Sequence, residues 1–384
     1  MAEFTLPGKI ITGGHALTEA APLLRELGGK ALIVTGKHVG TSSMMEELQD
    51  TLKAEGIDFA VFDGITGEPT DLMVEEGVRM YRESACDFCI GLGGGSPLDS
   101  AKAIAAMTAA PGKITDYNGK ILNAPHPPVA AIPTTAGTGS EATKFAVITD
   151  TQKDVKMLLK GDKLLPDLSI VDYRFSLSCS RSVTASSGLD ALTHAVEAYT
   201  SVKAQPLSDV YALSAVRRIL RWLPEAWMDG SSQEARREMA LASLEAGICI
   251  NNSSVTIVHG MSRPIGALFH IPHGLSNAML MNVCLRAVAG GALERFAALG
   301  RAVGAACDAD SDGKAAGEFL RRLKDICAVC QIPNFREYGI EKEAYLGAIE
   351  KMAEDAMASG SPENCRKYVT REEIMELYQK AYGE

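Results

Sequence analysis

The first part of the chain alternates short apolar runs with helix-like segments, and this rhythm limits its fold more than any other feature. Apolar runs bounded by glycine or proline occur at 30–36, 58–65, 86–94 and 128–135. Segments such as "TSSMMEELQDTLKAEG", with apolar residues spaced three and four apart, lie between them. Strands and helices that alternate in this way form a parallel sheet covered by helices. The pattern predicts an α/β nucleotide-binding domain with a parallel, Rossmann-like sheet.

The texture of the sequence changes near residue 181. Long helical patterns such as "SSGLDALTHAVEAYTS" and "SDVYALSAVRRILRWLPEAW" then follow one another with few strand candidates. A chain of 384 residues also exceeds what one hydrophobic core usually serves. We therefore expect an α/β dinucleotide-binding domain over 1–180 and an all-helical, metal-binding catalytic domain over 181–384.

The charge and apolar patterning of the chain limit its partners. A formal net charge of −10 argues against nucleic acid and against an anionic membrane surface. The sequence has no apolar run of about 18 residues, the length that predicts a membrane span. "MAEFTLPGKIITGG" lacks the basic-then-apolar layout of a signal peptide. We expect a cytoplasmic protein that acts on a small molecule.

Two C-x-x-C pairs raise the question of a zinc ribbon. They are Cys86 with Cys89 and Cys327 with Cys330. Four such cysteines could bind zinc. However, the first pair lies in a strand-like run and the second at a helix end, and neither has the glycine-rich context of a zinc knuckle. We interpret them as ordinary buried thiols, with no disulfides in a reducing compartment.

A glycine-rich turn, "GLGGGSPLDSAKAIAAM", follows one expected strand and opens a helix. Gly94 and Gly95 let the backbone approach a ligand, and the helix N-terminus offers free N–H groups to a diphosphate. Ser96 is predicted to cap this helix, with Asp99 three residues later in a capping-box arrangement. The turn is not G-x-G-x-x-G, so a strand–helix turn without a ligand is the alternative.

A second loop, "IPTTAGTGSEAT", follows the next expected strand. The hydroxyls of Thr134, Thr135 and Thr138 could meet ribose, phosphate or nicotinamide groups. Open α/β sheets bind ligands at the carboxyl edge of their strands, where two such loops would meet. An ordinary surface loop is the alternative; together the two loops predict one ligand cleft.

Four residues form a candidate set of metal ligands. "GLDALTHAVEAY" places Asp190 and His194 one helical turn apart on a single face. "HGMSRPIGALFHIPHG" contributes His259 and His273 from a second segment. Any one of these residues alone could be a surface or core residue without a ligand. One carboxylate with three imidazoles suits Fe²⁺ or Zn²⁺ and is too rich in nitrogen for Mg²⁺ or Ca²⁺.

These motifs occur in the order and spacing of the iron-containing (group III) alcohol dehydrogenases, which the sequence resembles over nearly its whole length. The resemblance implies hydride transfer between a nicotinamide cofactor and a short-chain alcohol or aldehyde bound to a divalent metal. It also implies a homo-oligomer, because relatives are often dimers or larger. Matched motif by motif, it implies the metal ligands Asp190, His194, His259 and His273, diphosphate contacts from Gly94, Gly95 and Ser96, a cofactor cleft lined by Thr134, Thr135 and Thr138, and a ribose contact from Lys156.

Arg263 departs from the family pattern, since many relatives have a histidine there. It lies one helical turn from His259 and could face the same pocket. Arginine stays protonated, so it cannot relay the substrate proton. It would either receive an anionic substrate tail or line the cleft paired with a carboxylate, and we favour the pairing. The proton would then leave through water or His270.

The cofactor preference follows from a second departure. Many NAD-preferring relatives carry an aspartate at the end of the ribose-facing strand, where it binds the 2′-hydroxyl. "LIVTGKHVG" instead has Gly36 followed by Lys37. The open space and positive charge predict NADP(H), with NAD(H) as the alternative.

Three groups of functions compete with this prediction, the first of them enzymes of the same broad fold. The zinc-dependent glycerol dehydrogenases, with one aspartate and two histidines, and the dehydroquinate-synthase-like lyases share the broad fold. The fourth ligand, His273, and the "TTAGTGSE" loop favour an iron-type dehydrogenase over both. A reductase specific for a small anionic-tailed aldehyde read by Arg263 is the second alternative. The third is a binding module without turnover, which a complete ligand set beside a phosphate turn disfavours.

Overall fold

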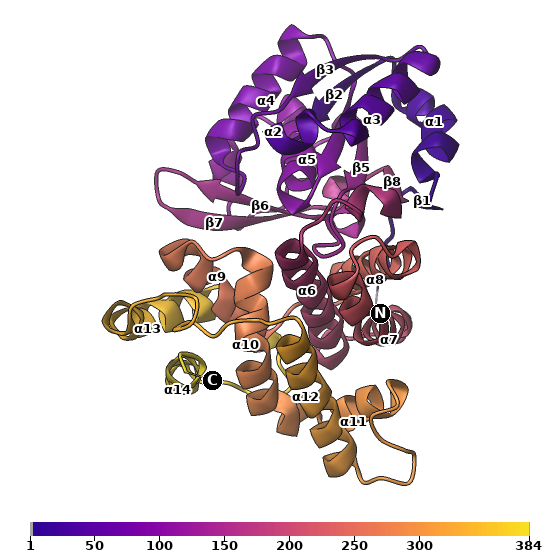
Figure 1. Cartoon of the computed structure of the whole chain (residues 1–384). Helices are drawn as coiled ribbons and strands as arrows, with labels where there is room; N and C mark the ends of the chain where they lie inside the picture. Colours follow the sequence, from indigo (N-terminus) through magenta and orange to yellow (C-terminus); the bar gives the residue numbers. More distant parts are fainter. Residues whose placement is uncertain (1–2, 384) are drawn as a thin grey trace. The chain divides into compact units, whose positions relative to one another are not determined.

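The computed structural model describes residues 3–383. The chain divides into two compact units, one from Thr5 to Ser178 and the other containing the residues from Cys179 onward. In Figure 1 the first unit runs from indigo to magenta and the second continues to yellow. Every predicted cofactor contact lies in the first unit, and every predicted metal ligand lies in the second.

The first unit is built on a six-stranded sheet in the order β1-β8-β5-β4-β2-β3, with every neighbouring pair parallel. This confirms the predicted parallel α/β fold. The four predicted apolar runs form β2 to β5. β1 and β8 were not predicted, because β1 is short and partly exposed and β8 carries polar residues among its apolar ones. The strands are β1 (Lys9–Gly13), β2 (Lys30–Val34), β3 (Asp58–Phe62), β4 (Phe88–Gly93), β5 (Val129–Pro133) and β8 (Leu168–Asp172).

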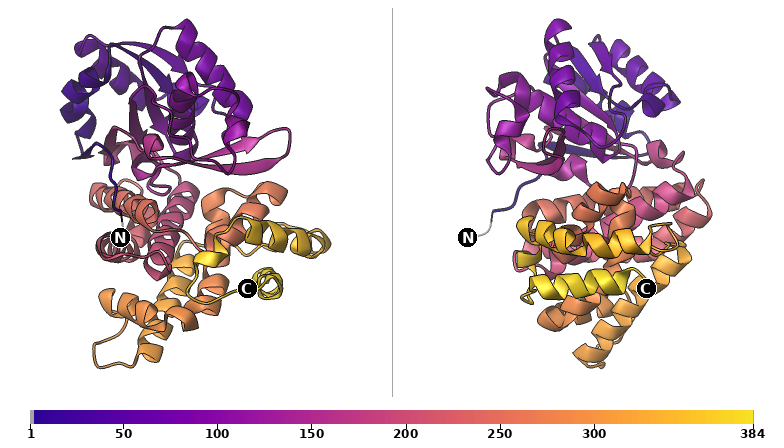
Figure 2. Two further views of the ribbon diagram at one scale, coloured as in Figure 1. Left: turned by 180° about the vertical axis from the view of Figure 1, so that it is seen from behind. Right: turned by 90° about the vertical axis from the view of Figure 1, so that its left-hand side faces the viewer.

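Helices cover both faces of this sheet, as Figure 2 shows. Ala31 and Ile33 of β2 pack in a core with α1 and α3, whereas Leu32 and Val34 pack in a second core with α4 and α5. A strand buried on both faces needs apolar residues at nearly every position, which explains its continuous apolar run. The helices are α1 (Ala16–Leu27), α2 (Lys37–Gly40), α3 (Ser43–Ala54), α4 (Asp71–Glu83) and α5 (Gly95–Ala109).

A β-hairpin that the sequence pattern did not reveal completes this unit. β6 (Phe145–Asp150) and β7 (Val155–Lys160) pair antiparallel. Ala146, Ile148 and Met157 lie in the core formed with α5. The burial of β6 alternates along its length, so its apolar residues occupy only one face and produce a weaker signal than the central strands.

The structure corrects the predicted start of α5. The helix begins at Gly95 and its N-cap residue is Gly94, with no side-chain cap, so the capping box assigned to Ser96 and Asp99 was wrong. A Cβ atom on Gly95 would lie 2.8 Å from Thr138 Cγ2, so a close approach between the two loops fixes this turn. The Asp99 carboxylate instead accepts hydrogen bonds from the Ser140 hydroxyl and, at 2.9 Å, from the backbone N–H of Val147.

Glu141 gives this unit a testable pH dependence. It lies in the 3₁₀ turn Ser140–Ala142 and is 1% exposed. Burial raises the pKa of its carboxyl to about 7, and the nearby Lys102 ammonium opposes this only in part. A raised pKa means that the folded state holds the proton more tightly than the unfolded chain does. The stability that this proton supplies is present in acid and is lost as the pH rises from about 4.5 to about 7.

Replacing Glu141 with glutamine is therefore expected to stabilise the protein most at alkaline pH. The gain in unfolding free energy over the parent should grow by roughly 2–3 kcal/mol between pH 5 and pH 8. Urea denaturation of both proteins at the two pH values measures this difference. The same gain at both pH values would contradict the assignment.

The second unit is helical, as predicted. The two long helical patterns of the sequence form α6 and α7, and α6 packs against α7, α8 and α10. Among the described residues of this unit, β-type backbone pairing is limited to one isolated bridge between Ser201 and Cys365. The helices are α6 (Arg181–Thr200), α7 (Pro206–Met228), α8 (Gln233–Asn252), α9 (Ile257–Phe269), α10 (His273–Val288), α11 (Leu293–Ala302), α12 (Asp312–Val329), α13 (Lys342–Ala358) and α14 (Arg371–Ala381).

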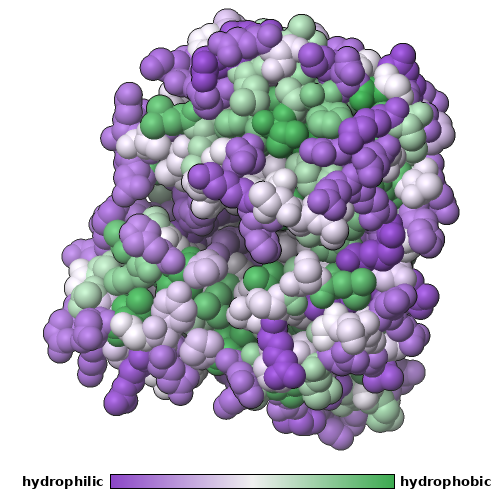
Figure 3. All heavy atoms as spheres, turned by 45° about the horizontal axis from the view of Figure 1, so that its top comes forward, coloured by the Kyte–Doolittle hydropathy of each residue, from purple (hydrophilic) through white to green (hydrophobic). Residues whose placement is uncertain are grey.

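Hydrophilic side chains interleave with apolar ones over the face drawn in Figure 3. Within residues 3–383, no single helix has both the length and the apolar content to cross a membrane. Only α8 and α9 taken together have the length and the apolar content of a membrane span, and this pair of helices is bent by 103°. All nine cysteines are free thiols, including Cys86, Cys89, Cys327 and Cys330, which are buried.

Candidate metal centre and cofactor loops

Three helices bring the four predicted metal ligands together. Asp190 and His194 lie one turn apart on α6, His259 lies in the first turn of α9, and His273 begins α10. Local sequence makes this convergence possible. A Cβ atom on Gly274 would lie 2.5 Å from the Ser186 carbonyl oxygen of α6, so a glycine after His273 lets α10 approach α6 closely.

The geometry of these four residues suits one cation. Asp190 Oδ1 lies 3.9 Å from His194 Nε2, 3.7 Å from His259 Nε2 and 3.8 Å from His273 Nε2. All four ligand atoms lie within 4.8 Å of one another. Tetrahedral bonds of about 2.1 Å put ligand atoms about 3.4 Å apart, so a small contraction completes the site. The residues present therefore fit Fe²⁺ or Zn²⁺.

Burial and charge keep Asp190 ionised. Burial alone would raise the pKa of its carboxyl, but His194, His273 and His259 face it and hold the pKa well below its ordinary value. For His259, burial lowers the pKa of the imidazole, while Glu197 and Asp190 more than reverse this. A bound cation would compete with that proton, since a metal ligand must offer a free lone pair.

Glu197 is a buried member of this cluster that the sequence analysis missed. Its carboxylate accepts hydrogen bonds from His259 Nδ1 at 2.6 Å, from Thr256 Oγ1 at 2.8 Å and from the backbone N–H of Val258 at 2.6 Å. With Nδ1 donating, His259 presents Nε2 to Asp190, the arrangement that a carboxylate imposes on metal-binding histidines. The signal was present in the sequence, because Glu197 lies seven residues after Asp190 on the same helix face.

Asn277 is the second missed residue. It lies on α10 one turn after His273 and is fully buried. Its side-chain nitrogen Nδ2 lies 2.7 Å from Asp190 Oδ1, 3.1 Å from His259 Nε2 and 3.2 Å from His273 Nε2. A carboxamide thus directly adjoins the predicted ligand atoms.

The structure contradicts the favoured arrangement for Arg263. None of the ion pairs among residues 3–383 includes Arg263, whose guanidinium donates one hydrogen bond, from Nη1 to Ser361 Oγ at 3.0 Å. Burial lowers its pKa, and the more distant Glu197 opposes this shift. Within residues 3–383 the expected pairing with a carboxylate is therefore not found, and Glu197, the carboxylate whose charge acts on Arg263, is engaged by His259, Thr256 and Val258.

His270, the predicted alternative exit for the proton, is the C-cap residue of α9. It is exposed and has a left-handed backbone conformation with φ of 54°. This conformation ends α9 three residues before His273 begins α10. Its place in proton transfer stays a prediction.

The two predicted cofactor loops lie side by side in the first unit. The backbone N–H of Thr134 donates to the carbonyl of Gly93 at 2.8 Å. A Cβ atom on Gly94 would lie 3.5 Å from Thr135 Oγ1, and one on Gly95 would contact Thr138. Ser96 lies in the first turn of α5 beside them. The loops therefore bring a helix N-terminus without a side-chain cap next to the hydroxyls of Thr135 and Thr138, which suits a phosphate group.

The other predicted cofactor residues lie in the same unit. Lys156, on β7, forms an ion pair with Glu68 at 2.7 Å. Gly36 follows β2 as the N-cap of α2, and a Cβ atom there would lie 2.7 Å from the Ile65 carbonyl oxygen. A side chain at position 36 would therefore require the backbone to shift. Asp99 supports the fold of the loops through Ser140 and Val147, as described above.

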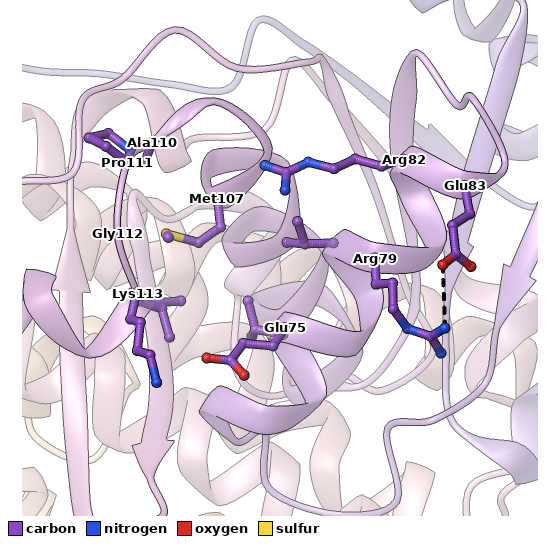
Figure 4. A pocket seen from close by; sticks show the side chains of 12 residues that line it. Glu75, Arg79, Arg82, Glu83, Met107, Ala110, Pro111, Gly112 and Lys113 are labelled. Carbon is purple, nitrogen blue, oxygen red and sulfur yellow. Dashed lines mark hydrogen bonds and ion pairs between the residues drawn. The ribbon is translucent and has the colours of Figure 1, made fainter.

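A cavity of about 630 Å³ lies elsewhere in the first unit, between α4 and the segment that follows α5 (Figure 4). Val74, Val78 and Met107 are among the apolar residues that line it, and Arg79 pairs with Glu83 at its rim at 3.4 Å. None of the predicted cofactor residues lines this cavity.

Comparison with known proteins decides the family. The family model described as "Iron-containing alcohol dehydrogenase" matches residues 7–173. A second model, described as the C-terminal part of the Fe-containing alcohol dehydrogenase family, matches residues 184–382. The chain belongs to the iron-containing alcohol dehydrogenase family. Membership makes it an oxidoreductase of the alcohol dehydrogenase type, as the sequence motifs predicted.

Two of the relatives match over 99–100% of their own length. The chain is 34% identical to the NAD-dependent methanol dehydrogenase of Bacillus methanolicus, over 99% of this chain and 100% of the relative. It is 35% identical to the 1,3-propanediol dehydrogenase of Citrobacter freundii, over 100% of this chain and 99% of the relative. A solved structure of 1,3-propanediol oxidoreductase superposes with a TM-score of 0.96 at 33% identity, covering 100% of both chains.

Proposed function

We propose that this protein interconverts a short-chain alcohol and its aldehyde with a nicotinamide cofactor and a divalent metal. The observation that carries the proposal is the convergence of Asp190, His194, His259 and His273 in a buried cluster. These four residues would hold the metal, which when bound supplies Lewis-acid chemistry at the alcohol oxygen. The names of the methanol and propanediol relatives support a small, unbranched substrate.

Each protein group has a definite task in this proposal. Asp190 stays ionised among three imidazoles and provides the negative charge of the ligand set. Glu197 holds His259 with Nε2 directed at Asp190. The N-terminus of α5 and the threonine loop would bind the diphosphate and nicotinamide parts of the cofactor, which carries the hydride. The domain over 1–180 would thus bind the cofactor and the domain over 181–384 the metal.

The finer choices of metal and cofactor belong to this proposal. Fe²⁺ is the expected metal, as in the name of the family. Zn²⁺ is the alternative, because carboxylate and imidazole ligands bind both metals. NADP(H) is supported by Gly36 and Lys37, whereas the name of the methanol dehydrogenase supports NAD(H). We also propose that the protein is cytoplasmic and that it forms a homo-oligomer. Light scattering of the purified protein would test the oligomer.

Anaerobic assay of the metal-loaded protein tests the activity. Protein loaded with Fe²⁺, or separately with Zn²⁺, should oxidise NADPH or NADH in the presence of a short neutral aldehyde, and chelated protein should not. A larger kcat/KM with NADPH would support the role of Gly36 and Lys37, and a larger value with NADH would overturn it. Turnover that is equally fast after chelation would contradict the metal-dependent reaction.

One observation favours a second candidate, a reductase for small aldehydes with an anionic tail. Arg263 is half-buried one turn from His259, and within residues 3–383 its guanidinium has a single hydrogen bond and no carboxylate partner. A partly buried cation without a counter-ion is unfavourable, and a carboxylate or sulfonate tail would neutralise it. Arg263 would then select the substrate.

Replacing Arg263 with alanine tests this second candidate. The variant should lose about 10- to 100-fold in kcat/KM on an aldehyde that carries a carboxylate, and less on a neutral aldehyde of similar size. Arg286→Ala, at an exposed position on α10, is the matched control. Equal losses on the two aldehydes would show that Arg263 does not recognise a tail.

A further inference from the structure

We propose that the cavity between α4 and the segment that follows α5 binds a small carboxylate with an apolar chain, and that Arg82 holds the carboxylate group. The site goes beyond the proposed function, since none of the predicted cofactor residues or metal ligands lines this cavity. Its volume of about 630 Å³ falls within the range of roughly 300–1,000 Å³ that is usual for small-molecule sites. All of its lining residues belong to the first unit.

Part of the cavity wall is apolar. Val74 and Val78 lie one turn apart on α4, and Met107 lies near the end of α5. Ile114, in the 3₁₀ turn that follows, completes this part of the wall. All four side chains are buried, and the unbranched methionine can adapt its shape to a neighbouring group. Such a wall suits an aliphatic chain.

Hydrogen bonds hold two parts of the wall in place. The Arg82 guanidinium donates from Nη2 to the carbonyl oxygen of Thr108 at 3.2 Å, which joins α4 to the end of α5. The Tyr117 hydroxyl donates to the carbonyl oxygen of Pro111 at 2.8 Å and so fixes the segment after α5. A ligand therefore does not have to order these parts of the wall when it binds, which lowers the cost of binding.

The charges of the wall favour an anion. Five charged residues line the cavity: Glu75, Arg79, Arg82, Glu83 and Lys113. Arg79 and Glu83 form an ion pair at 3.4 Å, so their charges offset each other. This leaves the two cations Arg82 and Lys113 against the single carboxylate of Glu75. A local excess of positive charge, on a chain whose formal net charge is −10, selects for a negatively charged ligand.

Arg82 has hydrogen-bond donors left for that ligand. Within residues 3–383 its guanidinium makes one hydrogen bond, to Thr108, and pairs with no carboxylate. A guanidinium carries five N–H donors, and a carboxylate accepts two of them in parallel. Figure 4 shows the Arg82 side chain extended toward the side of Met107, with Glu75 on the opposite side of the cavity. A carboxylate on Arg82 is thus kept apart from the like charge of Glu75.

The spacing along α4 fixes where the apolar chain would lie. Val74, Val78 and Arg82 follow one another four residues apart, so they form one stripe of the helix surface. A carboxylate bound to Arg82 would therefore leave its chain beside the two valines. The arrangement suits an unbranched aliphatic monocarboxylate.

Nuclear magnetic resonance of the full-length protein, labelled with ¹³C at the methionine methyl groups, tests the inference. Hexanoate would be titrated at constant ionic strength, and the Met107 signal, identified with a Met107→Leu variant, would be followed. This signal should shift to saturation with a Kd of about 1 mM, as expected for so small a ligand. Butanoate buries two fewer CH₂ groups and should bind about 10-fold more weakly.

Two variants and one neutral ligand isolate the role of Arg82. Arg82→Ala should bind hexanoate about 10-fold more weakly than the parent, because a hydrogen-bonded charge is lost. Arg25→Ala is the matched control and should equal the parent: Arg25 is an exposed arginine of α1 that also donates to one backbone carbonyl, that of Gly56 at 3.4 Å. Hexanamide, which has the same chain without the charge, should bind the parent about 10-fold more weakly than hexanoate does. Circular dichroism establishes that both variants fold.

The signal of Met107 reports on this cavity alone, so hexanoate bound elsewhere on the protein does not imitate the expected result. A Met107 signal that does not shift to saturation with hexanoate would overturn the site. Equal affinities of the parent for hexanoate and hexanamide would overturn the recognition of a carboxylate. A folded Arg82→Ala variant that binds hexanoate as tightly as the parent would overturn the role of Arg82.

Discussion

Replacing Asp190 with asparagine is expected to lower kcat/KM for aldehyde reduction by at least about 10³-fold, because a bound metal contributes several kcal/mol and each 1.4 kcal/mol is a factor of ten. Asp190 is the anionic member of the four-residue ligand set, and its oxygen faces all three imidazoles at 3.7–3.9 Å. Asparagine preserves the shape of the side chain and removes the charge. The predicted loss is therefore one of metal binding rather than of packing.

Metal content and fold are measured on the same Asp190→Asn samples. The variant should retain little Fe²⁺ or Zn²⁺ after gel filtration, while its circular dichroism matches that of the parent. Asp308→Asn, which removes an exposed carboxylate, is the control and should behave as the parent in both measurements. A variant that loses activity but keeps a full complement of metal would contradict the role given to Asp190.

Replacing Glu197 with glutamine is expected to weaken metal binding by about 10- to 100-fold, although Glu197 is not itself predicted to touch the metal. One of its oxygens accepts from His259 Nδ1 and the other from Thr256 and Val258. Glutamine has one oxygen and one NH₂ group. An N–H would therefore face another donor on one side, whichever way the amide turns.

The Glu197→Gln variant should also lose about 1–3 kcal/mol of unfolding free energy, because a buried donor is left unpaired. Competition with a chelator measures the metal affinity, and urea denaturation of the metal-free protein measures stability. Glu225→Gln serves as the comparison for metal affinity. Glu225 lies on α7, and its half-buried carboxylate accepts a hydrogen bond from the Ser232 hydroxyl. If the glutamine variant binds metal as the parent does, Glu197 does not position His259.

Features that depend on short stretches of sequence could be predicted. The parallel sheet followed from strands that are apolar at nearly every position, since both of their faces are buried. The candidate ligand set followed from residue types that are scarce in this chain, at spacings that suit a helix and a second segment. The hairpin β6–β7 escaped because its apolar residues occupy only one face.

Features that depend on tertiary neighbours could not be predicted in the same way. The start of α5 is fixed by the approach of Gly95 to Thr138, which lies far along the chain. Within residues 3–383 Arg263 forms a hydrogen bond to Ser361 rather than the expected ion pair, and the nearby charge of Glu197 is bonded to His259. Asn277 is an ordinary residue of α10 in the sequence, and only the folding of three helices places its carboxamide beside Asp190.

Transfer of deuterium from a labelled nicotinamide tests the central claim most directly. NADPH or NADH carrying deuterium at both C4 positions would be incubated anaerobically with a short aldehyde and either metal-loaded or chelated protein. The account predicts one deuterium on the carbinol carbon of the alcohol with the loaded protein, and none with the chelated protein. Deuterium transfer that is undiminished by complete removal of the metal, or no transfer with fully loaded protein, would contradict it.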